Sequence, residues 1–144
     1  MKDQKGFTLI EIMVVIIILG MLAGLVLPRI LGQEETAKRK VAMTQIRALE
    51  GGLDHYKLDN GSYPTTDQGF DALIRKPESG RVPMKWREGG YLNPARIPKD
   101  PWGRDYVFIS PGGENRDYEI ISYGADGEPG GEGNNADIQS WTME

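Results

Sequence analysis

The chain begins with an apolar run that constrains its fold more than any other feature. From Phe7 to Leu27 the sequence reads FTLIEIMVVIIILGMLAGLVL, 21 residues in which Glu11 is the only charge. At a rise of about 1.5 Å per residue, a helix of this length spans about 30 Å, the thickness of one hydrocarbon core. The run is apolar on every side, so it does not resemble a half-buried surface helix. We therefore expect a transmembrane or assembly helix over residues 7–27.

Two other interpretations of this run stay open. The first is a secretory signal peptide with Lys2 and Lys5 as its basic start, although no A-x-A cleavage site follows the run. The second is a plain membrane anchor that is never cleaved. A helical pattern resumes soon after Pro28, which favours one long helix that continues outward with a kink at the proline.

Glu11 needs a partner if it lies inside such a helix. A carboxylate in a membrane helix costs roughly 2.5–3.5 kcal/mol on insertion scales. If the chain were cut after Gly6, Phe7 would carry a new terminal ammonium one helical turn from Glu11. The pair could form within one chain or between staggered chains, and in the second case it would set the register of a bundle.

The segment KGFTLIE at residues 5–11 resembles the cleavage motif of type IV pilins and pseudopilins. In that family an inner-membrane prepilin peptidase cuts after the glycine and N-methylates the new terminal phenylalanine. The resemblance implies a leader peptide at residues 1–6, cleavage after Gly6, methylation of Phe7 and an assembly role for Glu11. It also implies a single-pass protein of the bacterial inner membrane whose residues 28–144 form a periplasmic globular domain.

Beyond Pro28 the pattern predicts an amphipathic helix to about Asp59, followed by a small sheet. Apolar side chains recur in alternating steps of four and three residues, which makes a stripe suited to packing on a sheet. The members of this stripe are Ala42, Ile46, Leu49, Leu53 and Tyr56.

The segment from Ser62 to Asp100 is loop-like, with a short helix expected at Gln68–Arg75. The runs DYVFIS and DYEIIS then flank a Pro-Gly-Gly-Glu-Asn turn and predict a β-hairpin with Tyr106 and Phe108 on one face. A long helix followed by a small antiparallel sheet is an α+β arrangement, and with the N-terminal motif it predicts a pilin-like fold.

The last segment, residues 122–141, combines five glycines with four carboxylates in 20 residues. Its spacing matches neither an EF-hand nor a dinucleotide-binding fingerprint. Glycine allows tight turns that aim carbonyl oxygens inward, and carboxylates supply the hard oxygen ligands that Ca²⁺ prefers. From composition alone, a flexible acidic loop is the simpler interpretation.

The whole chain resembles the major pseudopilins of the type II secretion system. The resemblance rests on the YPT turn, the DPWG motif, the hairpin and the closing SYGADG…GGEG…ADI…W. It implies a structural Ca²⁺ in the C-terminal loop, held by Asp126, Asp137 and the carbonyl of Tyr123. Asn134 is a weaker candidate ligand, because a neutral side chain in place of a carboxylate lowers affinity for the cation.

Composition argues against catalysis and against nucleic-acid binding. The chain has no cysteine and a single histidine, His55, so nucleophile–base triads and zinc sites lack their parts. A formal net charge of −4 gives no basic footprint for nucleic acid. The absence of cysteine also leaves a small extracytoplasmic domain without a disulfide staple, a role that a metal ion or assembly can fill.

Together with this composition, the resemblance implies a non-enzymatic subunit of a periplasmic pseudopilus filament that drives protein export. The partners that the resemblance implies are further copies of the chain in a helical homopolymer, minor pseudopilins, the prepilin peptidase and the inner-membrane secretion platform. Two alternatives stay open: a type IV pilin or minor pseudopilin, and a membrane-tethered Ca²⁺-dependent binding module.

Overall fold

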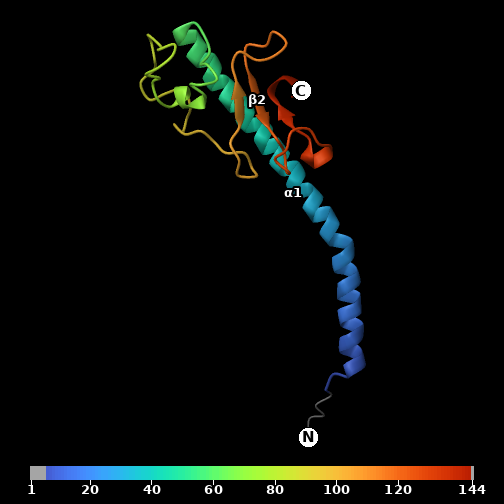
Figure 1. The fold of residues 1–144 in the computed structure, drawn as a ribbon. Coiled ribbons are helices and arrows are strands. Elements are labelled where there is room, and N and C mark those ends of the chain that lie inside the picture. Colours follow the sequence, from blue (N-terminus) through green and yellow to red (C-terminus); the bar gives the residue numbers. More distant parts are fainter. Residues whose placement is uncertain (1–5, 144) are drawn as a thin grey trace. The chain divides into compact units, whose positions relative to one another are not determined.

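The computed structural model describes residues 6–143 of the chain, with the backbone alone at residues 26–31. One long helix, α1 (Leu9–Asn60), supplies 52 residues and precedes all the other regular elements described (Figure 1). The chain divides into two units, residues 1–36 and residues 37–144. The single long helix was predicted from the sequence. The predicted kink at Pro28 falls among residues 26–31, and its side chain lies outside the described residues.

The described part of the first unit is the beginning of α1. Every described side chain from Phe7 to Leu25 is exposed, and large apolar residues such as Leu9 and Leu25 expose 81% and 66% of their surface. Because the helix is apolar all round, no one face of it is distinguished as the side that would be buried. Among the described residues, none of the helices combines the length with the apolar character that a membrane crossing needs. The predicted span ends at Val26 and Leu27, whose side chains lie outside the described residues.

The second unit is built on the apolar stripe of α1. The stripe residues predicted from the sequence are all buried, and four of them are fully inaccessible to solvent. They form one core together with side chains from the loops and the sheet, which are Phe70, Ala72, Leu73, Tyr91, Tyr106, Phe108, Ile120 and Ile138. Burial raises the pKa of Tyr106, whose neutral hydroxyl donates a hydrogen bond to Gln45 on α1. The helix is therefore the support on which the rest of the unit packs.

The sheet has three short antiparallel strands in the order β1-β2-β3. Strands β1 (Val107–Ile109) and β2 (Glu119–Ser122) form the predicted hairpin, with Phe108 opposite Ile120. Strand β3 (Ile138–Gln139) adds to the other edge of β2, where Ser122 pairs with Ile138. The prediction placed Tyr106 and Phe108 on one face, and both are buried. The third strand was not predicted, because two residues are too few to show a period in the sequence.

The segment between α1 and β1 is irregular, as predicted, apart from one turn of 3₁₀ helix, η1 (Phe70–Leu73). The prediction of a helix over Gln68–Arg75 was therefore too long. Gln68 instead closes a turn, because its side-chain Oε1 accepts a hydrogen bond from the amide of Thr65. Two further one-turn 3₁₀ helices follow the hairpin, η2 (Gly133–Asn135) and η3 (Ser140–Thr142).

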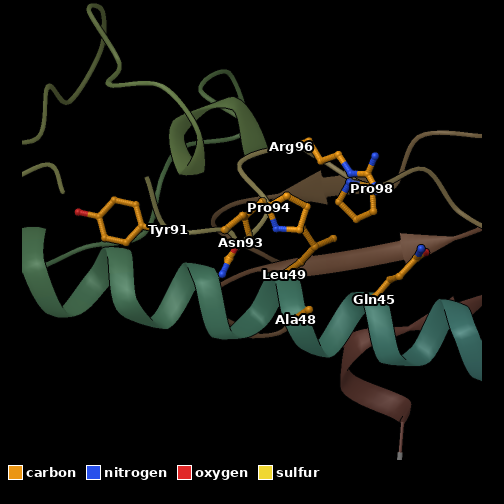
Figure 2. A pocket seen from close by; sticks show the side chains of 9 residues that line it. Gln45, Ala48, Leu49, Tyr91, Asn93, Pro94, Arg96 and Pro98 are labelled. Atoms are coloured by element: carbon orange, nitrogen blue, oxygen red, sulfur yellow. The ribbon is translucent and has the colours of Figure 1, made fainter. Parts of the chain in front are cut away.

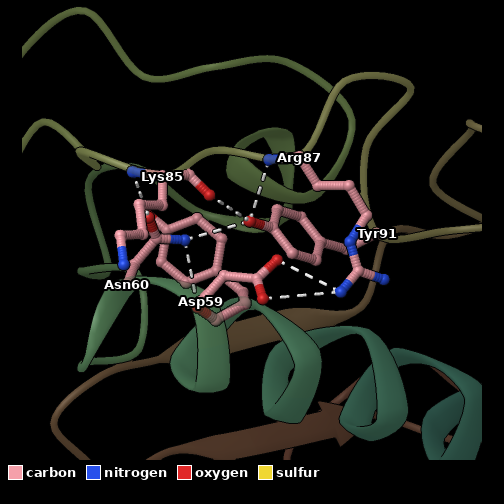
Figure 3. Close-up of polar contacts among 6 residues, drawn as sticks. Asp59, Asn60, Lys85, Arg87 and Tyr91 are labelled. Carbon is pink, nitrogen blue, oxygen red and sulfur yellow. Dashed lines mark hydrogen bonds and ion pairs between the residues drawn. The ribbon is translucent and has the colours of Figure 1, made fainter.

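A hydrogen-bonded cluster around Tyr91 attaches this segment to the end of α1 (Figure 3). The Tyr91 hydroxyl accepts hydrogen bonds from the Asn60 side chain at 3.0 Å and from the Arg87 amide at 3.1 Å. The same hydroxyl donates a hydrogen bond to the Lys85 carbonyl at 3.4 Å. Arg87 in turn pairs with Asp59 at 3.2 Å. A single phenol thus satisfies three polar groups in a segment that has no strand to satisfy them.

Two adjacent glycines on α1 give a direct test of this packing. A Cβ on Gly52 would lie 2.7 Å from Leu92 Cδ2 and 3.3 Å from the Tyr91 carbonyl oxygen, whereas a Cβ on Gly51 would meet nothing within 4 Å. We expect Gly51→Ala to stabilise the protein by about 0.5–1 kcal/mol, because alanine is the better helix former. We expect Gly52→Ala to destabilise it, since overpacking typically costs about 1–3 kcal/mol and outweighs the same helical gain.

Urea denaturation of the two variants measures both free energies of unfolding. Equal effects at the two positions would contradict the close approach of the 70–92 segment to α1.

Candidate functional site

The predicted cleavage position lies just before α1. Gly6 and Phe7 are exposed and precede the helix, and 84% of the Phe7 surface is accessible. Peptidases bind extended backbone, and a helix would hide the peptide bond in its own hydrogen bonds. The Gly6–Phe7 bond is therefore flanked by exposed residues and lies outside the hydrogen bonds of the helix.

Glu11 forms a capping box with Thr8 at the start of α1. Its Oε2 accepts hydrogen bonds from the Thr8 amide at 2.8 Å and from the Thr8 hydroxyl at 2.9 Å. The Glu11 amide donates back to the Thr8 hydroxyl at 3.3 Å. This arrangement satisfies amides that the first turn of a helix leaves without partners. The T-x-x-E spacing carried this signal, which the sequence-based interpretation of Glu11 as a partner for the new terminus did not use.

The acidic glycine loop, residues 123–137, connects β2 to β3. Its first limb, residues 123–126, and its second limb, residues 134–137, approach closely at Gly124. A Cβ there would lie 2.9 Å from the carbonyl oxygens of Asn135 and Ala136. The Ala125 amide donates to the Asn134 carbonyl at 3.3 Å, and the Asp137 amide donates to the Gly130 carbonyl at 3.1 Å. The loop is thus folded back on itself.

The four predicted Ca²⁺ ligands lie on these two limbs. The Tyr123 carbonyl and Asp126 lie on the first limb, where the carbonyl accepts from the Gly127 amide and Asp126 Oδ1 accepts from the Glu128 amide. Asn134 and Asp137 lie on the second limb. Asp137 Oδ2 accepts from the Gly130 amide at 3.0 Å. The hydrogen bond between Ala125 and Asn134 joins the two limbs.

One oxygen in this loop has no partner. Asp137 Oδ1 is buried and forms no hydrogen bond, and among the described residues it is the only buried side-chain polar atom of this kind. A buried carboxylate oxygen without a donor is costly, and a bound cation would offset that cost. Within the part of the chain that the structure describes, no three acidic or histidine side chains gather closely enough to hold a metal by themselves. Main-chain carbonyls would therefore have to complete any ligand set, as hard cations such as Ca²⁺ allow.

Two arginines contact the same loop, and neither was predicted from the sequence. Arg104 donates to the carbonyls of Gly124 at 3.0 Å and Ala125 at 3.3 Å. Arg39, on α1, donates to the carbonyls of Ala136 and Asn134. Contacts to main-chain carbonyls leave no residue pattern, which is why sequence reasoning missed them.

A buried carboxylate holds the turn from which Arg104 projects. Asp100 Oδ1 accepts hydrogen bonds from the amides of Trp102 and Arg104, and Oδ2 accepts from the Ser122 hydroxyl at 2.9 Å. Asp100 exposes only 4% of its surface. Because Ser122 is the last residue of β2, this contact ties the DPWG turn to the start of the acidic glycine loop.

A shallow groove also lies between α1 and the 91–98 segment (Figure 2). Leu49 and Ala48 line it from the helix, with Pro94 and Pro98 opposite, and Arg96 is its only charged lining residue. Acid–base catalysis uses a positioned donor and acceptor, and this lining supplies a guanidinium without a carboxylate beside it. The groove is thus a mainly apolar surface feature. The candidate functional residues lie at the N-terminal motif and in the acidic glycine loop.

Comparison with known proteins gives consistent matches along the chain. A family described as "Type II secretion system (T2SS), protein G" matches residues 29–141, and a "Prokaryotic N-terminal methylation motif" matches residues 1–27. The type II secretion system core protein G of Vibrio cholerae is 52% identical over 144 residues, 100% of this chain and 96% of that protein. The core protein G of Pseudomonas aeruginosa is 47% identical over 140 residues, 97% of this chain and 96% of that protein.

A crystal structure of the major pseudopilin from the type 2 secretion system of enterohaemorrhagic Escherichia coli has the same fold. It superposes with a TM-score of 0.67 at 43% sequence identity, covering 78% of this chain and 94% of that one. The predicted pilin-like α+β fold is therefore confirmed.

Proposed function

The chain belongs to the protein G family of type II secretion systems and is a major pseudopilin, and from this we propose that it is stored in the bacterial inner membrane, processed, and then polymerised. The family is structural, and the chain is not an enzyme. Membership of this family sets aside the alternatives of a surface pilin, a minor pseudopilin and a tethered binding module. On this proposal residues 28–144 lie in the periplasm, and the filament contains many copies of the chain. Its other partners are minor pseudopilins, the prepilin peptidase and the inner-membrane secretion platform.

The observation that carries this proposal is the exposed apolar surface of residues 7–25. Burying apolar surface is worth about 25 cal/mol per Å², so the first half of α1 is stabilised by lipid before assembly and by other helices after it. Head-to-tail contacts that do not close on themselves produce a helical filament. The exposed Gly6–Phe7 bond supports the processing step between the two environments.

Glu11 takes two partners in succession on this proposal. In the unprocessed chain its carboxylate caps α1 through Thr8. Cleavage after Gly6 creates an ammonium at Phe7, and in a bundle of staggered helices the carboxylate of one chain meets the ammonium of another. Such a pair is expensive to break in an apolar core, because either charge alone would be buried without a partner.

Processing is tested by mass spectrometry of the N-terminus of protein from secreting cells. We expect a chain that begins at Phe7 and carries one extra methyl group. A Gly6→Val variant should keep residues 1–6, because a β-branched side chain replaces the glycine at the scissile bond. An intact N-terminus in the assembled wild-type protein would contradict the proposal.

The register role of Glu11 is tested by comparing Glu11→Ala with Thr8→Val. Both variants disrupt the capping box: Glu11→Ala removes both hydrogen bonds to the carboxylate, whereas Thr8→Val removes the hydroxyl and leaves the Thr8 amide donating to Glu11. Loss of a capping side chain costs roughly 0.5–2 kcal/mol of helix stability. We expect only Glu11→Ala to abolish filament formation, measured by shearing and electron microscopy, because only it removes the carboxylate. Equal assembly defects in the two variants would assign Glu11 to helix capping alone.

We further propose that the acidic glycine loop binds a structural Ca²⁺. The unpartnered buried oxygen of Asp137 supports this, together with Asp126, the Tyr123 carbonyl and the neutral Asn134 on the same two limbs. When bound, the cation would supply the positive charge that offsets the two carboxylates. Since the unfolded chain has no such site, the binding free energy would add to the stability of the fold.

Removal of calcium tests this site. With free Ca²⁺ at 100 times its dissociation constant, binding adds about 2.7 kcal/mol to the free energy of unfolding. We therefore expect a chelator to lower the melting temperature of the wild-type protein. Asp137→Asn should abolish the difference between calcium and chelator, and Asp105→Asn, a surface carboxylate paired with Lys99, should keep it. An unchanged melting temperature of the wild type in chelator would remove the calcium proposal.

A further inference from the structure

The two arginines on the acidic glycine loop divide their contacts between its two limbs. Arg104 holds the first limb through the carbonyls of Gly124 and Ala125. Arg39 holds the second limb through the carbonyls of Asn134 and Ala136. A charged guanidinium makes hydrogen bonds about twice as strong as neutral ones, and its planar fork can bond two oxygens at once.

Both arginines are fixed from outside the loop. Arg104 follows the turn that the buried Asp100 carboxylate closes, and Arg39 belongs to α1. The first limb is therefore attached to the DPWG turn, and the second limb is attached to the long helix. Between the limbs themselves, the Ala125 amide donates a hydrogen bond to the Asn134 carbonyl at 3.3 Å.

The pattern of contacts leaves the acidic side chains unneutralised. Within the described residues, the guanidinium nitrogens of Arg39 and Arg104 bond carbonyl oxygens and form no ion pair with Asp126 or Asp137. Four carbonyls are thereby occupied, while the Asp137 Oδ1 atom keeps its lone pairs free. An arginine placed to neutralise the loop would instead bond the carboxylates.

We propose that Arg39 and Arg104 are positioning residues, which hold the two limbs of the loop at the separation that lets Asp126 and Asp137 share one divalent cation. This inference rests on the proposed Ca²⁺ site. Groups that orient metal ligands from behind typically change metal affinity by about 10–100-fold when they are removed.

The sign of the effect distinguishes positioning from simple electrostatics. Removing a positive charge near a cation site strengthens binding of the cation if charge alone matters. Loss of positioning weakens it. Arg104→Gln should therefore raise the dissociation constant for Ca²⁺ by about tenfold or more. Arg104→Lys should also weaken binding, because one ammonium keeps the charge but lacks the fork that reaches both carbonyls.

The test is calorimetric titration of the full chain in detergent with Ca²⁺ alone, on wild type, Arg39→Gln, Arg104→Gln and Arg104→Lys. Arg75→Gln is the matched control, since it removes an equal charge from an exposed pair with Asp71. Melting temperatures are measured in calcium and in chelator. A purely structural arginine would lower both equally, whereas a positioning arginine shrinks the difference between them.

A second pair of variants reaches the same contact without changing charge. A Cβ on Gly127 would clash with the Arg104 guanidinium, whereas a Cβ on Gly133 would meet nothing within 4 Å. Both glycines have a positive φ, +74° and +61°, so an alanine is strained at both. Gly127→Ala should weaken Ca²⁺ binding more than Gly133→Ala, and this comparison holds even if Arg104→Gln does not fold.

The outcomes separate the two proposals. Weaker binding in the arginine variants and in Gly127→Ala supports positioning. Wild-type binding with unchanged or tighter binding in the Arg104 and Arg39 variants overturns it and leaves the calcium site standing. A wild-type protein that takes up no Ca²⁺ overturns the calcium site, and this inference with it.

Discussion

The globular unit depends on one packing surface, the apolar stripe along the second half of α1. Strands of two to four residues are too short to be stable by themselves, and three of them make a sheet only because a hydrophobic face covers one side. Ile46, Leu49 and Leu53 provide that face and are fully buried. The helix can hold this role because its backbone hydrogen bonds form within the helix, over 52 residues, and do not depend on the sheet.

Packing on a helix does not satisfy the polar groups of the long irregular segments, and two side chains take over this task. Tyr91 gathers donors and an acceptor from the end of α1 and from residues 85–87. Asp100 does the same for the turn before β1 and for the end of β2. Each replaces several backbone partners that a strand would have supplied, so irregular backbone can be stable here. The cost is that a single side chain supports many contacts.

The sequence predicted the elements whose apolar residues recur at a regular period. It could not predict contacts that side chains make to main-chain groups. The stripe from Ala42 to Tyr56 repeats at the helical period, and the hairpin alternates around a glycine-rich turn, so both were predictable. Strand β3 has no period to detect, and η1 is shorter than the pattern around it suggested. At the acidic glycine loop the candidate ligands came from a family resemblance, but Arg39 binds carbonyls 95 and 97 residues away and leaves no pattern.

The single chain leaves two needs unmet at opposite ends of its sequence, and they have a common physical form. The apolar first half of α1 is exposed on every side, and the buried Asp137 Oδ1 has no donor. Each is unfavourable for an isolated molecule in water, the first through apolar hydration and the second through desolvation of an unpaired oxygen. On the proposed function, lipid or neighbouring helices would meet the first need, and a cation would meet the second. A chain without cysteine cannot form a disulfide, so no cross-link within the chain meets either need. On the proposed function such a subunit leaves one environment and enters another, and contacts that are not covalent allow that exchange.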